Sequence, residues 1–118
     1  MKRGQKSYEM IEAALDEIRE PEHWCKGALK TVRNGVVAYC ALGAFDEVTD
    51  FIPNPSGPKT EDWRTERDAW MALWNAAGGN IVRFNNTHTH AEVVAMFQQA
   101  ARAEKERLGV EAAEPVAA

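Results

Sequence analysis

The sequence has 118 residues, of which 45% are hydrophobic and 27% are charged, a composition that suits one soluble domain with a buried core. Its formal net charge is −4, and its basic cluster, Lys2, Arg3 and Lys6, lies at the N-terminus. Because contacts between basic side chains and phosphates drive nucleic-acid binding, this charge balance argues against a nucleic-acid partner.

The sequence also indicates where in the cell the protein is located and whether it holds a cofactor. It has no apolar run of about 18 residues, so we expect no transmembrane helix, and the basic N-terminus lacks the apolar stretch of a secretory signal. Two cysteines, Cys25 and Cys40, are too few for a disulfide framework and favour reduced thiols. No phosphate-binding loop or dinucleotide motif is present. We therefore expect a cytoplasmic protein without a membrane anchor or a cofactor.

The first predicted element is an amphipathic helix over residues 7–20. Ser7 can cap its first turn, and its apolar side chains recur at helical spacing. Pro21 ends it, because proline lacks a backbone donor and restricts the residue before it.

A β-hairpin is predicted next, with strands over about 24–33 and 36–40. Asn34 and Gly35 lie between them, and this pair supplies the two positive φ angles of a type I′ turn. The twist of such a turn matches that of the paired strands.

A short helix is predicted from Cys40 to about Thr49. It begins with Gly43 and Ala44 in its first turn, and side chains this small let another backbone approach closely. Residues 51–59 hold three prolines and a glycine and predict a loop.

A third helix is predicted from Thr60, whose hydroxyl can cap it, to Gly78 and Gly79, which favour a left-handed helix end. Its apolar face carries a stripe that includes three tryptophans, with the members Trp63, Trp70, Leu73, Trp74 and Ala77.

Residues 81–84 form a short, mainly apolar run, which predicts a strand that joins the hairpin. Thr89 and Glu92 then form a capping box for a helix that runs to about Leu108. The remaining residues, 109–118, show no periodicity and predict a disordered tail.

These elements predict an α+β domain over residues 1–108. About four helices pack on one face of a small, mainly antiparallel sheet made of the hairpin and one further strand.

Four short motifs occur in order along the chain. They are Trp24-Cys25-Lys26-Gly27-Ala28, Cys40-Ala41-Leu42-Gly43-Ala44, Phe84-Asn85-Asn86, and Thr89 with Glu92-Val93. This order resembles an uncharacterised family of small proteins from actinobacteria and their phages, a domain of unknown function. Its pattern is Trp-x-x-Gly-Ala, Cys-Ala-x-Gly-Ala, a strand ending in Trp-Asn-Asp, and Thr-x-x-Glu-Val. The resemblance spans about residues 8–103 and implies a bacterial or phage setting without an assigned activity.

The sequence departs from that pattern at Asn86, where the family has aspartate. The missing carboxylate argues against any role that requires an acid at this position.

Cys40 is a candidate nucleophile, because it lies where a strand meets the start of a helix, and a helix N-terminus stabilises a thiolate. His88 or His90 could supply a base, and Asn85 or Asn86 could orient it. The competing interpretation is a buried packing thiol, which is the usual state of cysteine. The two histidines could also bind zinc, but the four ligands of a structural site are not evident, so we predict no metal site.

Two surfaces are candidates for binding. Asn85, Asn86 and His88 lie where the apolar pattern lapses between a strand end and a helix start, so their side chains are expected to turn outward. Trp63 begins the tryptophan stripe beside the flexible loop and could serve an interface. The competing interpretations are a capped turn and a core stripe.

We therefore expect a non-enzymatic accessory protein that binds a partner protein or a small polar ligand. A phage-encoded modulator acting in the host cytoplasm is consistent with the resemblance. The alternatives are a small hydrolase or transferase built on Cys40, and a structural subunit of a larger assembly.

Overall fold

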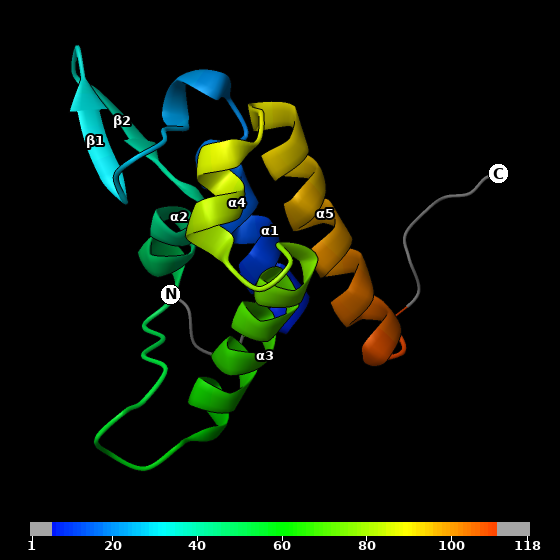
Figure 1. Ribbon diagram of the computed structural model, residues 1–118. Coiled ribbons are helices and arrows are strands. Elements are labelled where there is room, and N and C mark those ends of the chain that lie inside the picture. The colour runs from blue at the N-terminus through cyan, green and yellow to red at the C-terminus, as the bar shows by residue number, and fades with distance from the viewer. Residues whose placement is uncertain (1–5, 111–118) are drawn as a thin grey trace, which may run out of the picture.

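The computed structural model describes residues 6–110, which form five α-helices, one 3-10 turn and one β-hairpin. The helices form one body, and the hairpin projects from one end of it (Figure 1). The elements in chain order are α1 (Ser7–Ile18), η1 (Pro21–His23), β1 (Lys30–Arg33), β2 (Val36–Tyr39), α2 (Ala41–Val48), α3 (Glu61–Ala76), α4 (Ile81–Thr87) and α5 (His90–Arg107). The predicted α+β class is confirmed.

The first helix is the centre of the core. Its predicted apolar stripe is confirmed, because Ile11, Leu15 and Ile18 are all buried. The predicted cap is shifted by one residue: Lys6 is the N-cap, whereas Ser7 lies inside the first turn. The Ser7 hydroxyl is buried and donates a hydrogen bond of 2.6 Å to Glu104 near the end of α5.

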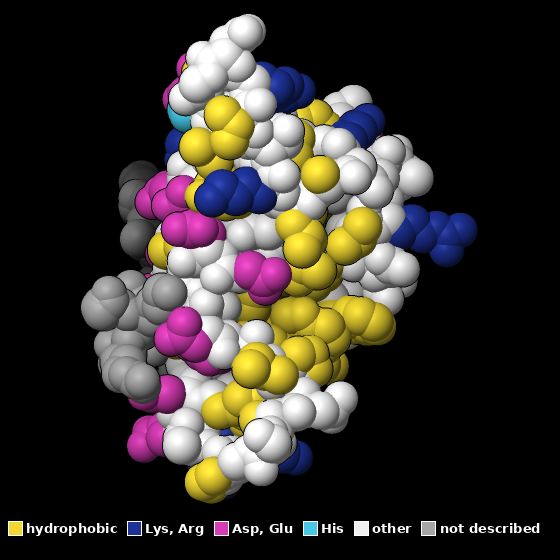
Figure 2. Space-filling view, turned by 90° about the vertical axis from the view of Figure 1, so that its left-hand side faces the viewer, with side chains coloured by type: hydrophobic (Ala, Val, Ile, Leu, Met, Phe, Trp, Pro, Cys, Tyr) yellow, Lys and Arg dark blue, Asp and Glu magenta, His cyan; other side chains and the backbone are white. Residues whose placement is uncertain are grey.

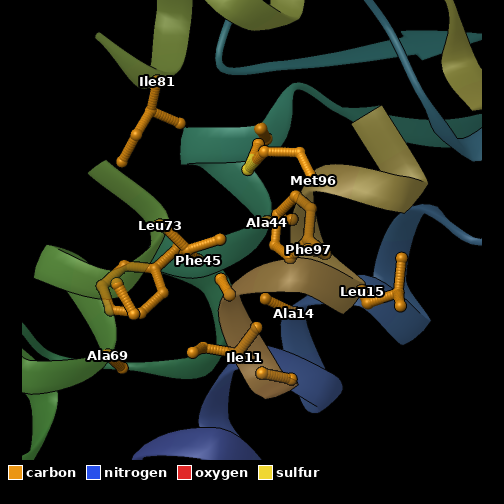
Figure 3. Close-up of a cluster of buried hydrophobic side chains, with 14 of the residues drawn as sticks. Ile11, Ala14, Leu15, Ala44, Phe45, Ala69, Leu73, Ile81, Met96 and Phe97 are labelled. Carbon is orange, nitrogen blue, oxygen red and sulfur yellow. The ribbon is translucent and has the colours of Figure 1, made fainter. Parts of the chain in front are cut away.

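The hydrophobic core is built from all five helices (Figure 3). Side chains from α1, α2, α3, α4 and α5 meet in it, including Ile11, Ala14, Leu15, Ala44, Phe45, Ala69, Leu73, Ile81, Met96 and Phe97. Several contributors are alanines, and this small side chain lets helices approach closely.

The helix ends follow the predicted capping chemistry. The Thr60 hydroxyl accepts the Trp63 amide, and Thr89 and Glu92 form the expected capping box. Two glycines with positive φ, Gly78 and Gly79, follow α3. These caps could be predicted from the sequence because each one satisfies unpaired N–H or C=O groups of the helix end within a single turn.

The last described residues belong to the cap of α5. The amides of Gly109 and Val110 donate to carbonyls of the final helical turn, over 3.2 Å and 2.8 Å. The rest of the predicted tail, 111–118, lies outside the described residues.

The hairpin has the predicted turn and shorter strands than expected. Asn34 and Gly35 have φ values of 51° and 78°, as a type I′ turn requires. The first strand covers only Lys30–Arg33 rather than 24–33. Residues before it instead run along the other side of β2, where Trp24 forms a parallel bridge.

The predicted third strand is wrong. Residues 81–84 begin α4, and the Asn80 side chain caps this helix by accepting the Arg83 amide over 2.8 Å. The buried face of α4 consists of Ile81 and Asn85, four residues apart, as on a helix. The sequence pattern concealed this period because the second buried residue is polar. Within residues 6–110, the sheet therefore contains only the two hairpin strands.

Gly43 makes the close approach that the sequence indicated. A Cβ atom at this position would lie 1.9 Å from the carbonyl oxygen of Leu29 and 2.8 Å from its carbonyl carbon. The same oxygen accepts the Cys40 amide over 3.1 Å, so it cannot move away without breaking that bond. Gly43 therefore fixes how closely α2 approaches the segment that leads into β1.

We predict that Gly43→Ala lowers the free energy of unfolding by about 1–3 kcal/mol, because the added methyl group overlaps backbone atoms. This loss outweighs the gain of up to about 1 kcal/mol that alanine normally brings to a helix. Urea denaturation measures the difference. Gly57→Ala is the matched control, since a Cβ there meets nothing within 4 Å. Equal stability of the two variants would contradict the close contact.

Candidate functional site

Asn85 is a buried hydrogen-bonding centre rather than an exposed turn residue. Its side chain is 0% exposed, so the expectation that it turns outward is wrong. Its Oδ1 atom accepts the Trp24 indole N–H over 2.7 Å and the Ala41 amide over 2.9 Å. Its Nδ2 atom donates to the Cys25 carbonyl over 2.9 Å and to Asn86 Oδ1 over 3.3 Å. Both ends of the amide are therefore used.

Asn86 extends this network to the surface. Its side chain is exposed, and its Oδ1 atom also accepts the Gly27 amide over 3.0 Å. The pair of asparagines thus joins α4 to the segment around residues 24–27 and to the start of α2. We call this set of hydrogen bonds the asparagine node. Three motifs that lie far apart in the sequence meet in it.

The node holds separate segments of the chain together. Asn85, at its centre, has no exposed reactive group. Each buried hydrogen bond is worth about 1 kcal/mol net, but leaving one partner unsatisfied costs about 1–3 kcal/mol. An asparagine is suited to this place because its side chain carries both an acceptor and a donor. A side chain with only an acceptor would leave the Cys25 carbonyl without its donor. A side chain with only a donor would leave the Ala41 amide without its acceptor.

Cys40 lies beside the node as the N-cap of α2. It is 2% exposed, and its sulfur accepts the Gly43 amide over 3.4 Å. The predicted burial of this thiol is therefore confirmed.

The described residues do not pair Cys40 with a basic side chain. Each histidine instead has a ring nitrogen hydrogen-bonded to a backbone carbonyl: His23 to Val37, His88 to Phe84 and His90 to Ile18, over 2.7–2.8 Å. The Cys-His-Asn arrangement considered from the sequence is thus not assembled in this structure.

Cys25 is also buried, and its thiol lies 3.4 Å from the Ala28 carbonyl that it donates to. Burial raises the pKa of the Cys25 thiol, the nearby Cys40 raises it further, and Arg33 opposes both effects. Cys25 is therefore protonated at neutral pH and poor as a nucleophile.

His88 is the C-cap residue of α4 and is half-buried. Its ring stacks on Phe84 with a centroid distance of 3.7 Å and an interplanar angle of 9°. It borders an open hollow of about 400 Å³ that Asn80, Arg83 and Thr87 also line. Asn86 thus lies on α4 and His88 follows directly after it, so the two remain neighbours as the sequence placed them, although residues 81–87 are helical rather than extended.

Trp63 lies apart from these residues, near the beginning of α3, whereas α4 follows the end of α3. About 20 Å of helix separates them, at about 1.5 Å per residue. The four residues expected to share a binding surface therefore fall into two groups.

Trp63 belongs instead to a chain of aromatic rings that we call the aromatic strip. Its members are Phe51, Trp63, Trp70 and Trp74. Phe51 lies 5.6 Å from Trp63 and 5.8 Å from Trp70, and Trp70 lies 4.8 Å from Trp74, between ring centroids. The Trp63 indole also donates to the Ile52 carbonyl over 2.7 Å. The strip therefore fastens the segment before α3 onto that helix.

The strip is only partly covered. Trp74 is 37% exposed and Ile52 is 59% exposed, while Phe51, Trp63 and Trp70 are half-buried. Figure 2 shows hydrophobic side chains gathered across the middle of the face that carries the hairpin, α2 and the 49–60 segment. Sequence reasoning had found the tryptophan stripe but not Phe51, because this residue joins the strip from a loop with no periodicity.

Charged residues border the strip. Lys59 and Arg67 lie over the Trp63 ring, 5.3 Å and 5.5 Å from its centroid. Acidic residues lie at both of its sequence junctions: Asp46, Glu47 and Asp50 before Phe51, and Glu61 and Asp62 before Trp63. Partial desolvation raises the pKa of Asp46, although this residue is exposed at the surface of α2.

The described part of the chain offers neither a metal centre nor a membrane-spanning helix. Within residues 6–110, no group of three or more histidine, cysteine or acidic side chains could hold a metal ion. None of the helices described is both long and apolar enough to cross a bilayer.

Replacing each asparagine of the node with aspartate tests which side-chain atoms donate and which accept hydrogen bonds. We predict that Asn85→Asp lowers the free energy of unfolding by at least about 2 kcal/mol, because it removes a buried donor and adds a buried charge. Asn86→Asp should cause no loss, and a gain of up to about 1 kcal/mol, because Asn86 Oδ1 only accepts and a carboxylate accepts more strongly. Urea denaturation at pH 7 measures both variants. Equal losses at the two positions would contradict the assigned donors and acceptors.

We also predict that Cys25 and Cys40 resist iodoacetamide in the native protein and react after denaturation in urea, because both thiols are buried. Mass spectrometry of the digested protein follows each cysteine separately. Rapid labelling of Cys40 at neutral pH, before unfolding, would instead support a reactive thiol at the start of α2.

Comparison with known proteins identifies the family and no more. The chain matches no curated protein and no solved structure. A model of a family of unknown function, DUF6197, matches residues 3–103, which include the asparagine node and the aromatic strip. The chain therefore belongs to this family of unknown function.

Proposed function

We propose that this protein is an accessory protein that binds a partner protein through the aromatic strip. The observation that carries the proposal is the run of three tryptophans and Phe51 at the surface, ending in Trp74 with 37% of its area exposed. Tryptophan is enriched among the residues that dominate binding energy at protein interfaces. Contiguous exposed apolar surface of this kind commonly marks an interaction site.

The borders of the strip suggest the chemistry of the partner. Lys59 and Arg67 already lie over the Trp63 ring, so an apolar anchor of the partner is expected to contact Trp70 and Trp74.

The biological setting is part of the same proposal. The resemblance of the sequence motifs suggests a protein of actinobacteria or their phages that works in the cytoplasm, where it modulates a bacterial process by binding. The alternative of a hydrolase or transferase built on Cys40 has less support, because the thiol is buried and has no basic partner in the described residues.

We predict that Trp74→Ser weakens partner binding at least tenfold, equivalent to about 1.4 kcal/mol, because it removes the most exposed ring of the strip. Met71→Ser is the matched control. Met71 lies on the same helix and is 40% exposed, but it lines the hollow between α3 and α5 instead. Its binding should equal that of the wild type.

The measurement has two stages. Proteins captured from lysate by the wild type and by Met71→Ser, but lost with Trp74→Ser, are identified by mass spectrometry. Binding of the purified partner is then measured by calorimetry, after thermal denaturation has shown that all three proteins are folded. If Trp74→Ser binds as tightly as the control, or if no captured protein depends on Trp74, the proposal is wrong.

A further inference from the structure

The outer edge of β1 is open. A two-residue turn makes Arg33 and Val36 a hydrogen-bonded pair, and such pairs alternate along an antiparallel ladder. In this register Lys30 and Val32 direct their backbone N–H and C=O groups away from β2. No hydrogen bond from elsewhere in residues 6–110 reaches these groups.

The opposite edge of the hairpin, formed by β2, is covered by residues of the same chain. The outward carbonyl of Val37 on β2 accepts a hydrogen bond from the His23 ring over 2.8 Å. The outward carbonyl of Tyr39 accepts the Cys25 amide over 3.0 Å. The chain thus closes the edge of β2 with its own residues and leaves the edge of β1 unpaired, on a hairpin that projects from the helices (Figure 1).

The hairpin also differs in charge from the rest of this acidic chain. Residues 23–45 contain Lys26, Lys30 and Arg33 and no aspartate or glutamate. All three cations are exposed; Lys30 lies over the Tyr39 ring at 5.9 Å, and Arg33 donates a hydrogen bond to the Trp24 carbonyl over 3.2 Å. Residues 30 and 33 are separated by an odd number of positions, so they lie on opposite faces of the strand.

We propose that the edge of β1 binds an extended, acidic peptide segment of another protein as a third strand. Backbone hydrogen bonds to Lys30 and Val32 would provide affinity, as in other cases of strand addition. Cations along an edge discourage indiscriminate pairing, so an entering strand must carry complementary carboxylates on either face. A second copy of this chain is a poorer occupant, because two β1 edges would bring like charges together. This surface is separate from the aromatic strip and does not depend on the function proposed for it.

The test uses two blocked synthetic peptides of about seven residues, a usual strand length. One carries pairs of glutamates that alternate with pairs of valines, so that carboxylates lie on both faces of the strand, and the other replaces each glutamate with lysine. Hydrogen exchange of the ¹⁵N-labelled protein is followed by NMR. With the glutamate peptide at millimolar concentration, the amides of Lys30 and Val32 should exchange at least about fivefold more slowly, since they join a ladder. The lysine peptide should leave both unchanged.

Two variants separate the contributions. Val32→Pro removes one outward N–H, and proline is tolerated on edge strands. In this variant the glutamate peptide should no longer slow hydrogen exchange of the Lys30 amide. Lys30→Gln combined with Arg33→Gln should weaken peptide binding at least about threefold while the hairpin remains folded, as expected for charges that steer docking.

Three outcomes would overturn the proposal. One is that the glutamate peptide gives no protection of Lys30 and Val32. Another is that the lysine peptide protects them equally, which would show pairing without charge selection. The third is that both amides are already protected without peptide and that sedimentation shows a dimer, which would make a second copy the occupant.

Discussion

The fold depends on one buried amide. Asn85 accepts hydrogen bonds from Trp24 and Ala41 and donates to Cys25, so it holds three separate segments of the chain together. A residue that is 0% exposed and hydrogen-bonded at both ends of its side chain cannot be replaced by a group of the same size without an unsatisfied partner. Gly43 acts beside it, because only a residue without a side chain lets α2 approach the Leu29 carbonyl.

The sequence predicted the elements whose signals are local. The Asn34-Gly35 turn, the Thr89 capping box and the stripe of α1 each satisfy a rule within a few residues, and all three are present. The error at residues 81–84 had a different origin. An apolar run this short fits a strand or a helix equally, and the buried partner four positions on is Asn85, whose polarity was read as exposure.

The candidate sites were predictable to the extent that their signals are local. Burial of Cys40 followed from the usual behaviour of cysteine, and the position of Trp63 beside the loop was also predicted. The pairing of Phe51 with the tryptophans was not predictable, because it joins a loop to a helix through tertiary contacts. The open edge of β1 was not predictable either, since it depends on residues 23–25 covering β2 instead of extending β1. Thus the interior is held by the node, and the two proposed binding surfaces lie outside it.

Native-state hydrogen exchange of three N–H groups tests the central claim most directly. The Trp24 indole and the Ala41 amide donate to Asn85, and the Phe97 amide lies in the core helix α5. If Asn85 holds the fold together, both donors exchange only through global unfolding, with the same free energy and denaturant dependence as Phe97. Exchange of either donor through local opening, at a free energy several kcal/mol below that of Phe97, would contradict the account.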